Sequence, residues 1–357
     1  MSELLLVAGN RPQFIKLAPL HAELVRRKIP HKIIHTGQHY DHTMSDIFFA
    51  ELGIRVPDIQ LSISSSKHGA MTAELLVALE EVFERENPSQ VVVFGDTNST
   101  LAATLAAVKM SIEISHVEAG PRLGTFETPE EVNRVITDHL SNLRFACDDA
   151  SVQNLEAEGI TEGVIRSGDI MYDAHLLARP NTDAVRVRPH QLFVTLHRPQ
   201  NVDSIEAHEA IIKFISDYSG RVVFPMHPRT RKAAIKFDLM RKYEELDNLR
   251  LCEPLGFVDT LKCIYESEVV LTDSGGVQKD AFYARRRSLL LVPAGPWPEL
   301  VRTGWVRPAG WILDCDLSVE LSSMQSSNMP TEIPAEEFGT GQSASIIADK
   351  IAERLVL

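Results

Sequence analysis

Ionisable side chains recur in this sequence directly after short apolar runs, at the points where strands would end. Asp96 follows the run at 91–94, and Glu118 ends a stretch that is otherwise small or apolar. An ionisable group there is costly unless it is paired or used, and a carboxylate could act as a general acid or base. Asp96 could instead cap the next helix, but Thr97 and Ser99 could also cap it and leave Asp96 for chemistry.

Two further carboxylates, Glu130 and Glu131, lie at the start of a predicted helix. A structural interpretation is a capping box, with Thr128 as the cap and both carboxylates facing the positive end of the helix dipole. That interpretation alone could explain both residues.

Two cationic side chains, Arg11 and Lys16, follow the first apolar run. Gly9 allows a tight turn, and Pro12 fits the first helical position, so both cations lie near a helix N-terminus. An anion is favoured there. A solvated basic pair is the alternative, but the place of Arg11 after a buried strand favours anion binding.

The second half of the chain places His197 and His227 after two separate strands. Two histidines at strand ends that face one cleft are more telling than one, which would more often be structural. The segment 272–280, T-D-S-G-G-V-Q-K-D, reads as a strand, a glycine turn and a helix. Gly275 and Gly276 would let phosphate oxygens approach backbone N–H groups, and Asp280 could take ribose hydroxyls.

The elements that must position these groups alternate along the chain. Strands that are apolar throughout alternate with amphipathic helices, which predicts parallel sheets covered on both faces. A polar, proline-punctuated stretch at 178–189 predicts a linker between two α/β halves. In such sheets ligands bind beyond the carboxyl ends of the strands, so we expect the site in the cleft between the halves. The predicted strands are 4–8, 32–35, 91–94, 114–117, 144–146, 164–167, 191–195, 221–224, 249–252, 269–272 and 288–292.

Length and composition exclude several classes of protein. The 357 residues are enough for two domains, and the 44% hydrophobic and 24% charged fractions are ordinary for a globular chain. The formal net charge of −13 argues against wrapping nucleic acid. No apolar run has the length and flanks of a membrane span or a signal peptide. The four cysteines lack the spacing of zinc ligands, which predicts free thiols in the cytoplasm.

Taken together, these segments resemble the UDP-N-acetylglucosamine 2-epimerase family of the non-hydrolysing type. The family patterns G-[TN]-R-P-x-x-I-K, G-D-T, H-V-E-A-G, P-E-E-x-N-R, H-R-x-x-N, H-P and D-S-G-G-[IV]-Q occur in order between Gly9 and about Trp305. The variants G-N-R-P-Q-F-I-K and S-G-G-V-Q-K are more similar to the UDP-2,3-diacetamido-glucuronate 2-epimerases.

The resemblance implies two Rossmann-like domains with a central cleft, as in GT-B glycosyltransferases. It places the N-terminal domain at 1–175, with the helix 343–357 packed back on it, and the nucleotide-binding domain at 186–342. It also implies a UDP-sugar substrate, no cofactor or metal, and a cytoplasmic homodimer that serves polysaccharide and cell-envelope synthesis. Family chemistry removes the C2 proton while UDP leaves C1, and then returns both with C2 inverted.

The resemblance also implies a role for each matching residue. The acid–base carboxylates are Asp96, Glu118 and Glu130, with Glu131 in reserve, and His197 assists near the diphosphate. Gln38 and His39 match a loop that binds a second, activating UDP-N-acetylglucosamine in some members. The residues implied to hold the nucleotide and sugar are Arg11, Lys16, Arg134, His227, Ser274, Gly275, Gly276 and Asp280.

Two departures from the family pattern bear on the substrate. Asp280 stands where the family usually has Glu, and segment 292–296 lacks the R-D-x-T-E pattern, so that Arg302 or Arg307 would have to substitute. Three alternative functions therefore stay open: a hydrolysing 2-epimerase that releases UDP and N-acetylmannosamine, a GT-B glycosyltransferase, and a non-catalytic sugar-nucleotide binder.

Overall fold

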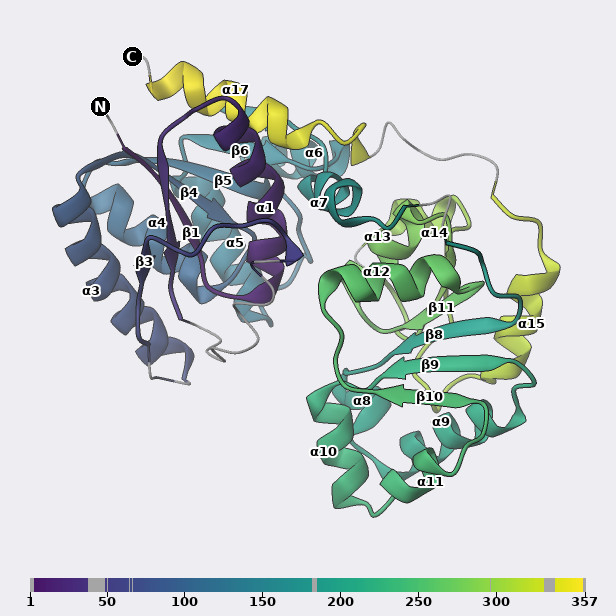
Figure 1. The fold of residues 1–357 in the computed structure, drawn as a ribbon. Coiled ribbons are helices and arrows are strands. Elements are labelled where there is room, and N and C mark those ends of the chain that lie inside the picture. Colours follow the sequence, from purple (N-terminus) through teal and green to yellow (C-terminus); the bar gives the residue numbers. More distant parts are fainter. Residues whose placement is uncertain are drawn as a thin grey trace. The chain divides into compact units, whose positions relative to one another are not determined.

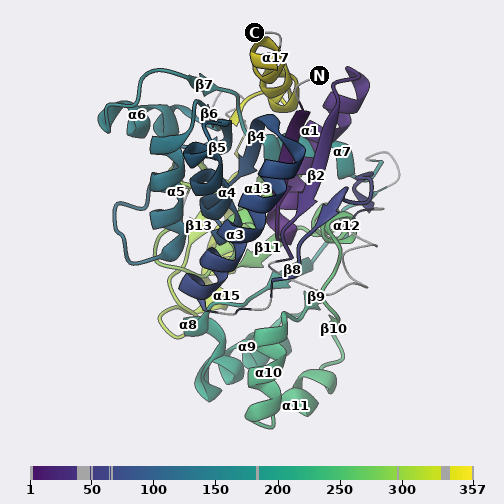
Figure 2. The same cartoon turned by 90° about the vertical axis from the view of Figure 1, so that its left-hand side faces the viewer.

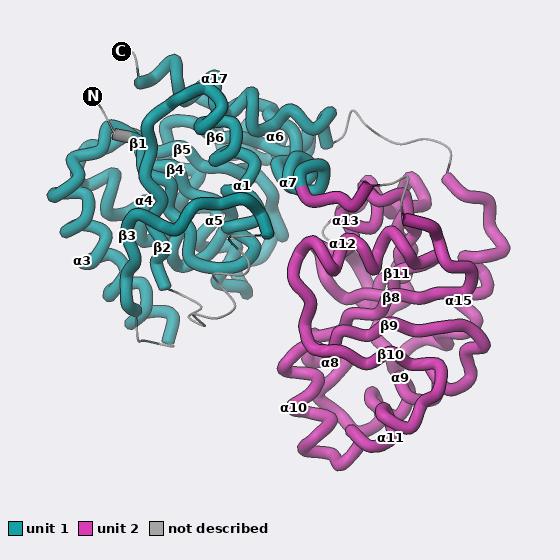
Figure 3. The backbone as a smooth tube through the Cα atoms, viewed as in Figure 1, with its two compact units in different colours: residues 1–177, 335–357 teal, residues 178–334 magenta. Residues whose placement is uncertain are grey.

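A computed structural model describes residues 3–37, 49, 51–63, 65, 67–181, 185–295, 297–330 and 338–355. The chain forms two compact units (Figure 3). Unit 1 comprises residues 1–177 and 335–357, and unit 2 comprises residues 178–334. Residues 335–342, which the sequence analysis gave to the second domain, group with unit 1. At this point the N–H of Asp169 donates to the carbonyl of Phe338 at 2.8 Å.

Unit 1 is built on a parallel sheet that has, within the described residues, seven strands in the order β3-β2-β1-β4-β5-β6-β7. The strands are β1 (Glu3–Ala8), β2 (His31–His35), β3 (Ile59–Gln60), β4 (Pro88–Phe94), β5 (Glu113–Ala119), β6 (Leu143–Ala146) and β7 (Val164–Arg166). The helices are α1 (Arg11–Arg26), α3 (His68–Glu86), α4 (Asn98–Lys109), α5 (Pro129–Leu140), α6 (Asp149–Ala157), α7 (Ile170–Ala178) and α17 (Ser343–Leu355).

Unit 2 has six described parallel strands in the order β10-β9-β8-β11-β12-β13. The strands are β8 (Gln191–Thr195), β9 (Arg221–Pro225), β10 (Leu249–Cys252), β11 (Val269–Thr272), β12 (Arg287–Leu290) and β13 (Val306–Pro308). The helices are α8 (Pro199–Val202), α9 (Ile205–Asp217), α10 (Pro228–Lys236), α11 (Met240–Glu244), α12 (Phe257–Glu266), α13 (Gly275–Tyr283), α14 (Pro298–Arg302) and α15 (Leu317–Ser326).

Successive strand residues point to opposite sides of a sheet, and in both units helices cover both of these sides. In unit 1, Leu5 and Val7 pack with residues of α3 and α4, while Leu4 and Leu6 are fully buried on the other side. Helices α3, α4 and α5 lie side by side (Figures 1 and 2), and α17 packs against α1. In unit 2, one face packs with α9 and α15 and the other with α12 and α13.

The fold class predicted from the sequence is therefore confirmed: two doubly wound α/β units of the Rossmann strand order. Several helices were not identified from the sequence, among them α3, α7, α12 and α15. Among the described helices, none is both long and apolar enough to cross a membrane.

Candidate active site

The predicted site residues of each unit gather at the point where the strand order reverses. In unit 1, β1 lies beside β4, so the turn that begins at Gly9 is next to the turn at Gly95 and Asp96. In unit 2, β8 lies beside β11, with Thr195 paired to Thr272. The connections leave in opposite directions at such a switch point, and this opens a crevice at the carboxyl ends of the strands.

Lys16 and Glu118 form a nearly buried ion pair at the switch point of unit 1. The Lys16 Nζ lies 2.6 Å from Glu118 Oε1, and the two side chains are 10% and 14% exposed. Gly95 lines the same spot with a positive φ of 60°, and a Cβ there would lie 3.0 Å from Lys16 Nζ. Gly95 therefore allows the backbone after β4 to approach this pair closely.

The backbone of Glu118 is in the left-handed region, with φ at 70°. The register between β5 and β6 shifts between Val117 and Ala119, so Glu118 is the extra residue of a β-bulge. Glutamate rarely adopts this conformation, and both bulges and such strained residues concentrate at functional sites. The bulge takes Glu118 out of the strand alternation and directs its carboxylate toward Lys16.

Asp96 belongs to a second charged cluster, together with Arg134 and Glu131 of α5. Arg134 donates to the Asp96 carboxylate through Nη2 and to Glu131 Oε2 through Nη1, the latter at 2.6 Å. Thr97 caps α4, since its hydroxyl accepts from the N–H of Thr100 at 3.3 Å. Thr97 rather than Asp96 is therefore the cap of α4.

The two adjacent glutamates of α5 differ in their surroundings. Glu131 is buried, and its carboxylate also accepts from the N–H groups of Leu123 and Gly124 at 2.8 and 3.4 Å. Thr128 caps α5, with its hydroxyl accepting from the N–H of Glu131. Glu130 is exposed at the start of α5. Glu131 is therefore held by Arg134 and by the loop that precedes α5, whereas Glu130 is accessible.

The remaining predicted residues of unit 1 follow from these placements. Arg11 is the first residue of α1, directly after Asn10, which caps this helix. Gln38 and His39 lie outside the described residues.

A buried network that the sequence analysis did not identify supports this edge of the sheet. His116 contacts Asp138 Oδ1 at 2.6 Å through Nδ1 and the Gly95 carbonyl at 2.7 Å through Nε2. Asp138 Oδ2 accepts from the N–H of Gly120 and from Arg122. Burial raises the pKa of Asp138, but His116 and Arg122 outweigh it and lower that pKa overall. The residues that flank Glu118 are thereby tied to α5, a link between distant segments that no local motif signals.

His197 and Asp273 form the corresponding centre in unit 2. His197 Nδ1 lies 2.9 Å from Asp273 Oδ1, and the His197 side chain is 39% exposed while that of Asp273 is fully buried. Burial raises the pKa of Asp273, but hydrogen bonds from His197, Arg198 and Asn201 outweigh it and lower that pKa overall. The ring of His227 lies 5.3 Å from that of His197, and partial burial followed by the nearby His197 lowers the pKa of His227.

The N-terminus of α13 lies beside this centre. Ser274 caps the helix, and its hydroxyl accepts from the N–H of Val277 at 3.5 Å. A Cβ added at Gly276 would meet nothing within 4 Å, so no packing within the chain requires glycine there. The open backbone N–H groups of a helix start suit an anion. Asp280, on the same helix, is buried rather than a surface charge.

Trp297, which directly follows the segment that departs from the family pattern, is held to the start of α13. Trp297 Nε1 donates to the Gly275 carbonyl at 3.0 Å, and Lys279 Nζ lies 3.4 Å from the centre of the indole ring. Lys279 is 2% exposed, which makes it a buried cation close to the helix start. Arg307, one of the two candidates to replace the arginine missing from the family pattern, donates to Glu320 at 2.7 Å.

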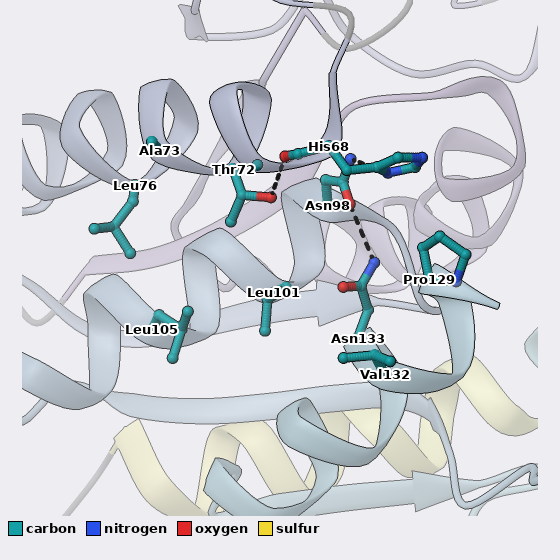
Figure 4. A pocket seen from close by; sticks show the side chains of 11 residues that line it. His68, Thr72, Ala73, Leu76, Asn98, Leu101, Leu105, Pro129, Val132 and Asn133 are labelled. Atoms are coloured by element: carbon teal, nitrogen blue, oxygen red, sulfur yellow. Dashed lines mark hydrogen bonds between the residues drawn. The ribbon is translucent and has the colours of Figure 1, made fainter. Parts of the chain in front are cut away.

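A further cavity lies on the helical face of unit 1. It measures about 490 Å³ and is lined by α3, α4 and α5 (Figure 4). At its polar corner, Asn133 donates to Asn98, which in turn contacts His68 (Figure 4). Asn133 also donates to the carbonyl of Asp96 at 3.0 Å, but neither Glu118 nor Lys16 lines the cavity. Nowhere in the described part of the chain do three or more His, Cys, Asp or Glu side chains form a group suited to a metal ion.

Two doubly wound units, one with ion-paired carboxylates and the other with a histidine and a helix start at its switch point, define an α/β protein of GT-B-like architecture. The glycosyltransferase SnogD from Streptomyces nogalater shares this fold, with a TM-score of 0.61 at 13% identity over 99% of both chains. Over residues 22–352 the chain matches the UDP-N-acetylglucosamine 2-epimerase family, a family of isomerases, and it belongs to that family.

Individual relatives cover nearly the whole chain. A UDP-N-acetylglucosamine 2-epimerase homolog of Methanococcus maripaludis is 39% identical, over 96% of this chain and 97% of its own. The UDP-2,3-diacetamido-2,3-dideoxy-D-glucuronate 2-epimerase of Pseudomonas aeruginosa is 36% identical, over 98% and 99%. The crystal structure of Methanocaldococcus jannaschii UDP-GlcNAc 2-epimerase in complex with UDP-GlcNAc and UDP matches with a TM-score of 0.87 and 34% identity, over 98% and 99%.

Proposed function

We propose that this chain inverts C2 of a UDP-linked N-acetylhexosamine, or of a 2,3-diacetamido uronate, without releasing the free sugar. The observation that carries the proposal is the ion pair of Glu118 with Lys16 at the switch point of unit 1, beside Asp96 and Arg134. Inversion needs one group to remove the C2 proton from one face and another to return a proton to the opposite face. Two carboxylates at neighbouring strand ends supply such groups.

The reaction divides between the two units. One carboxylate, Glu118, Asp96 or Glu130, takes the C2 proton, and the electron pair of the C–H bond forms the C1=C2 double bond. The C1–O bond breaks, and UDP leaves with the electron pair of the C1–O bond. The N-terminus of α13 and the cation of Lys279 stabilise the departing diphosphate, with His197 and His227 beside them. UDP then adds back to C1, and a proton returns to C2 from the other face.

The remaining residue roles follow from the same proposal. Arg134 and Arg11 bind the sugar and phosphates, and Asp280 and Ser274 bind the nucleotide. A homodimer, a cytoplasmic location, a role in cell-envelope polysaccharide synthesis and activation through Gln38 and His39 stay predictions from the sequence.

Proton NMR in heavy water tests the proposal, with UDP-N-acetylglucosamine and the diacetamido uronate as substrates. We expect loss of the C2 proton signal together with a UDP-linked manno product. Free sugar and UDP would instead indicate the hydrolysing reaction. Retention of the C2 proton with both substrates would overturn the proposal in favour of a binder or a transferase.

A pair of matched variants tests the assignment of the third carboxylate. Glu130→Gln should lower the rate of C2 exchange by about 10²-fold or more, the scale of general acid–base catalysis. Glu127→Gln changes an exposed carboxylate in the loop just before α5 and should leave the rate unchanged. Equal rates for both variants would remove Glu130 from the reaction, and Glu131→Gln would then test the reserve assignment.

A further inference from the structure

Asp273 directly follows β11 and accepts several hydrogen bonds. The sequence patterns assign it no role. It is fully buried at the end of β11. Its Oδ2 accepts from the N–H of Arg198 at 2.8 Å and from Asn201 Nδ2 at 3.0 Å. The N–H of His197 reaches both carboxylate oxygens, at 3.1 and 3.0 Å.

The other oxygen, Oδ1, faces the ring of His197. Its distance to His197 Nδ1 is 2.9 Å, within hydrogen-bond range. An ionised carboxylate can only accept hydrogen bonds, so Nδ1 must carry the proton in this contact. Nε2 is then the ring nitrogen that can exchange a proton with a ligand.

We propose that Asp273 is a positioning residue that keeps a proton on His197 Nδ1, so that the imidazolium gives its proton to the departing diphosphate from Nε2 and is left in the Nδ1–H tautomer. This inference rests on the proposed function, in which UDP leaves beside His197. The imidazolium gives its Nε2 proton to a phosphate oxygen as the C1–O bond breaks, and the ring remains as the neutral Nδ1–H form. The proton returns to Nε2 when UDP adds back.

The substitution Asp273→Asn separates this role from a structural one. The amide oxygen can take the place of Oδ2 and keep the bonds from Arg198 and Asn201. The amide NH₂ then faces His197 Nδ1 and donates to it, which selects the Nε2–H tautomer. The local backbone contacts survive in large part, but the amide no longer accepts from Nδ1–H, so the ring cannot give up its Nε2 proton and remain in the Nδ1–H form.

The first measurement needs no substrate. At a pH where the ring is neutral, ¹⁵N NMR should show the proton of His197 on Nδ1 in the unsubstituted protein and on Nε2 in Asp273→Asn. A proton on Nε2 in the unsubstituted protein would overturn the inference. Because no sugar is involved, this result is independent of the proposed epimerase activity.

The second measurement is a double-mutant cycle on the rate of C2 exchange. Asp273→Asn should lower kcat by about 10²-fold with a smaller change in KM, since general acid catalysis is lost. In the background of His197→Asn, Asp273→Asn should cost almost nothing more, because it acts through His197. Additive losses would overturn the inference and indicate a structural role.

Asp203→Asn provides the matched control for the cycle. Asp203 ends α8 close to the same loop, but it is exposed and pairs with Arg229. Its substitution should leave both the tautomer of His197 and kcat unchanged.

Discussion

The strained backbone of Glu118 predicts that two substitutions with the same loss of activity differ in stability. Two substitutions remove the same carboxylate. Glu118→Gln keeps a side chain in the left-handed region, whereas Glu118→Gly removes the steric cost of that conformation. Both should lower the rate of C2 exchange by about 10²-fold or more.

The magnitudes follow from the ion pair and from the backbone. Removing one partner of a buried pair costs about 3–5 kcal/mol, and the slight exposure of Lys16 and Glu118 reduces this to about 2–3 kcal/mol for Glu118→Gln. In Glu118→Gly, removal of the left-handed strain stabilises the folded state by about 1–2 kcal/mol. The greater conformational freedom of glycine in the unfolded chain offsets about 0.5–1 kcal/mol of that gain. Glu118→Gly should therefore be about 1 kcal/mol more stable than Glu118→Gln.

Urea unfolding of both variants, with C2 exchange measured on the same samples, checks this reasoning. Lys16→Met combined with Glu118→Gln leaves no unpaired buried charge and should recover most of the lost stability. Lys28→Gly is the control for strain, because Lys28 also has a positive φ but follows α1 away from the strand ends. It should stabilise by about 1 kcal/mol without loss of activity. Equal stability of Glu118→Gly and Glu118→Gln would refute the argument from strain.

Two further predictions concern other parts of the molecule. Trp297→Phe removes the hydrogen bond to the Gly275 carbonyl and weakens the cation–π contact with Lys279, so UDP should bind several-fold more weakly in calorimetry. Unchanged affinity would show that Trp297 does not support the nucleotide site. Burial is the main cause that lowers the pKa of His21 from 6.5 to about 4, and the charge of His31 is the second. As the pH falls, the unfolded state therefore takes up this proton before the folded state does, and the free energy of unfolding decreases between pH 6.5 and about 4. The loss due to His21 should be about 3 kcal/mol, and urea unfolding of His21→Asn should show a pH dependence that is flatter by that amount.

The helices that the sequence predicted are mostly those that begin with a side-chain cap. Thr97, Thr128 and Ser274 each accept a hydrogen bond from the first turn of their helix, and each stands at a recognisable position. Helices α3 and α12 begin at Lys67 and Gly256 without a side-chain cap. Their start depends on tertiary packing, which a local pattern does not show.

The candidate site divides in the same way. The alternation of strands with helices was enough to predict that Glu118 and Asp96 lie at the same edge of the sheet, because the carboxyl ends of parallel strands meet there. The bulge at Glu118 and the engagement of Glu131 by the loop that precedes it depend on atoms that only the folded chain brings together. The pairing of Asp273 with His197 joins residues 76 positions apart, although the first belongs to a recognisable motif.

Because unit 1 is divided between two stretches of sequence, the two units are completed in a fixed order during synthesis. Unit 2 is encoded as one continuous insertion, so all of it emerges from the ribosome before residues 335–357 do. Until then α1 lacks its partner α17, and Arg27 lacks its contacts with Ser345 and Asp349. The domain that begins first therefore finishes last, and during that interval α1 exposes an apolar surface that a chaperone could protect.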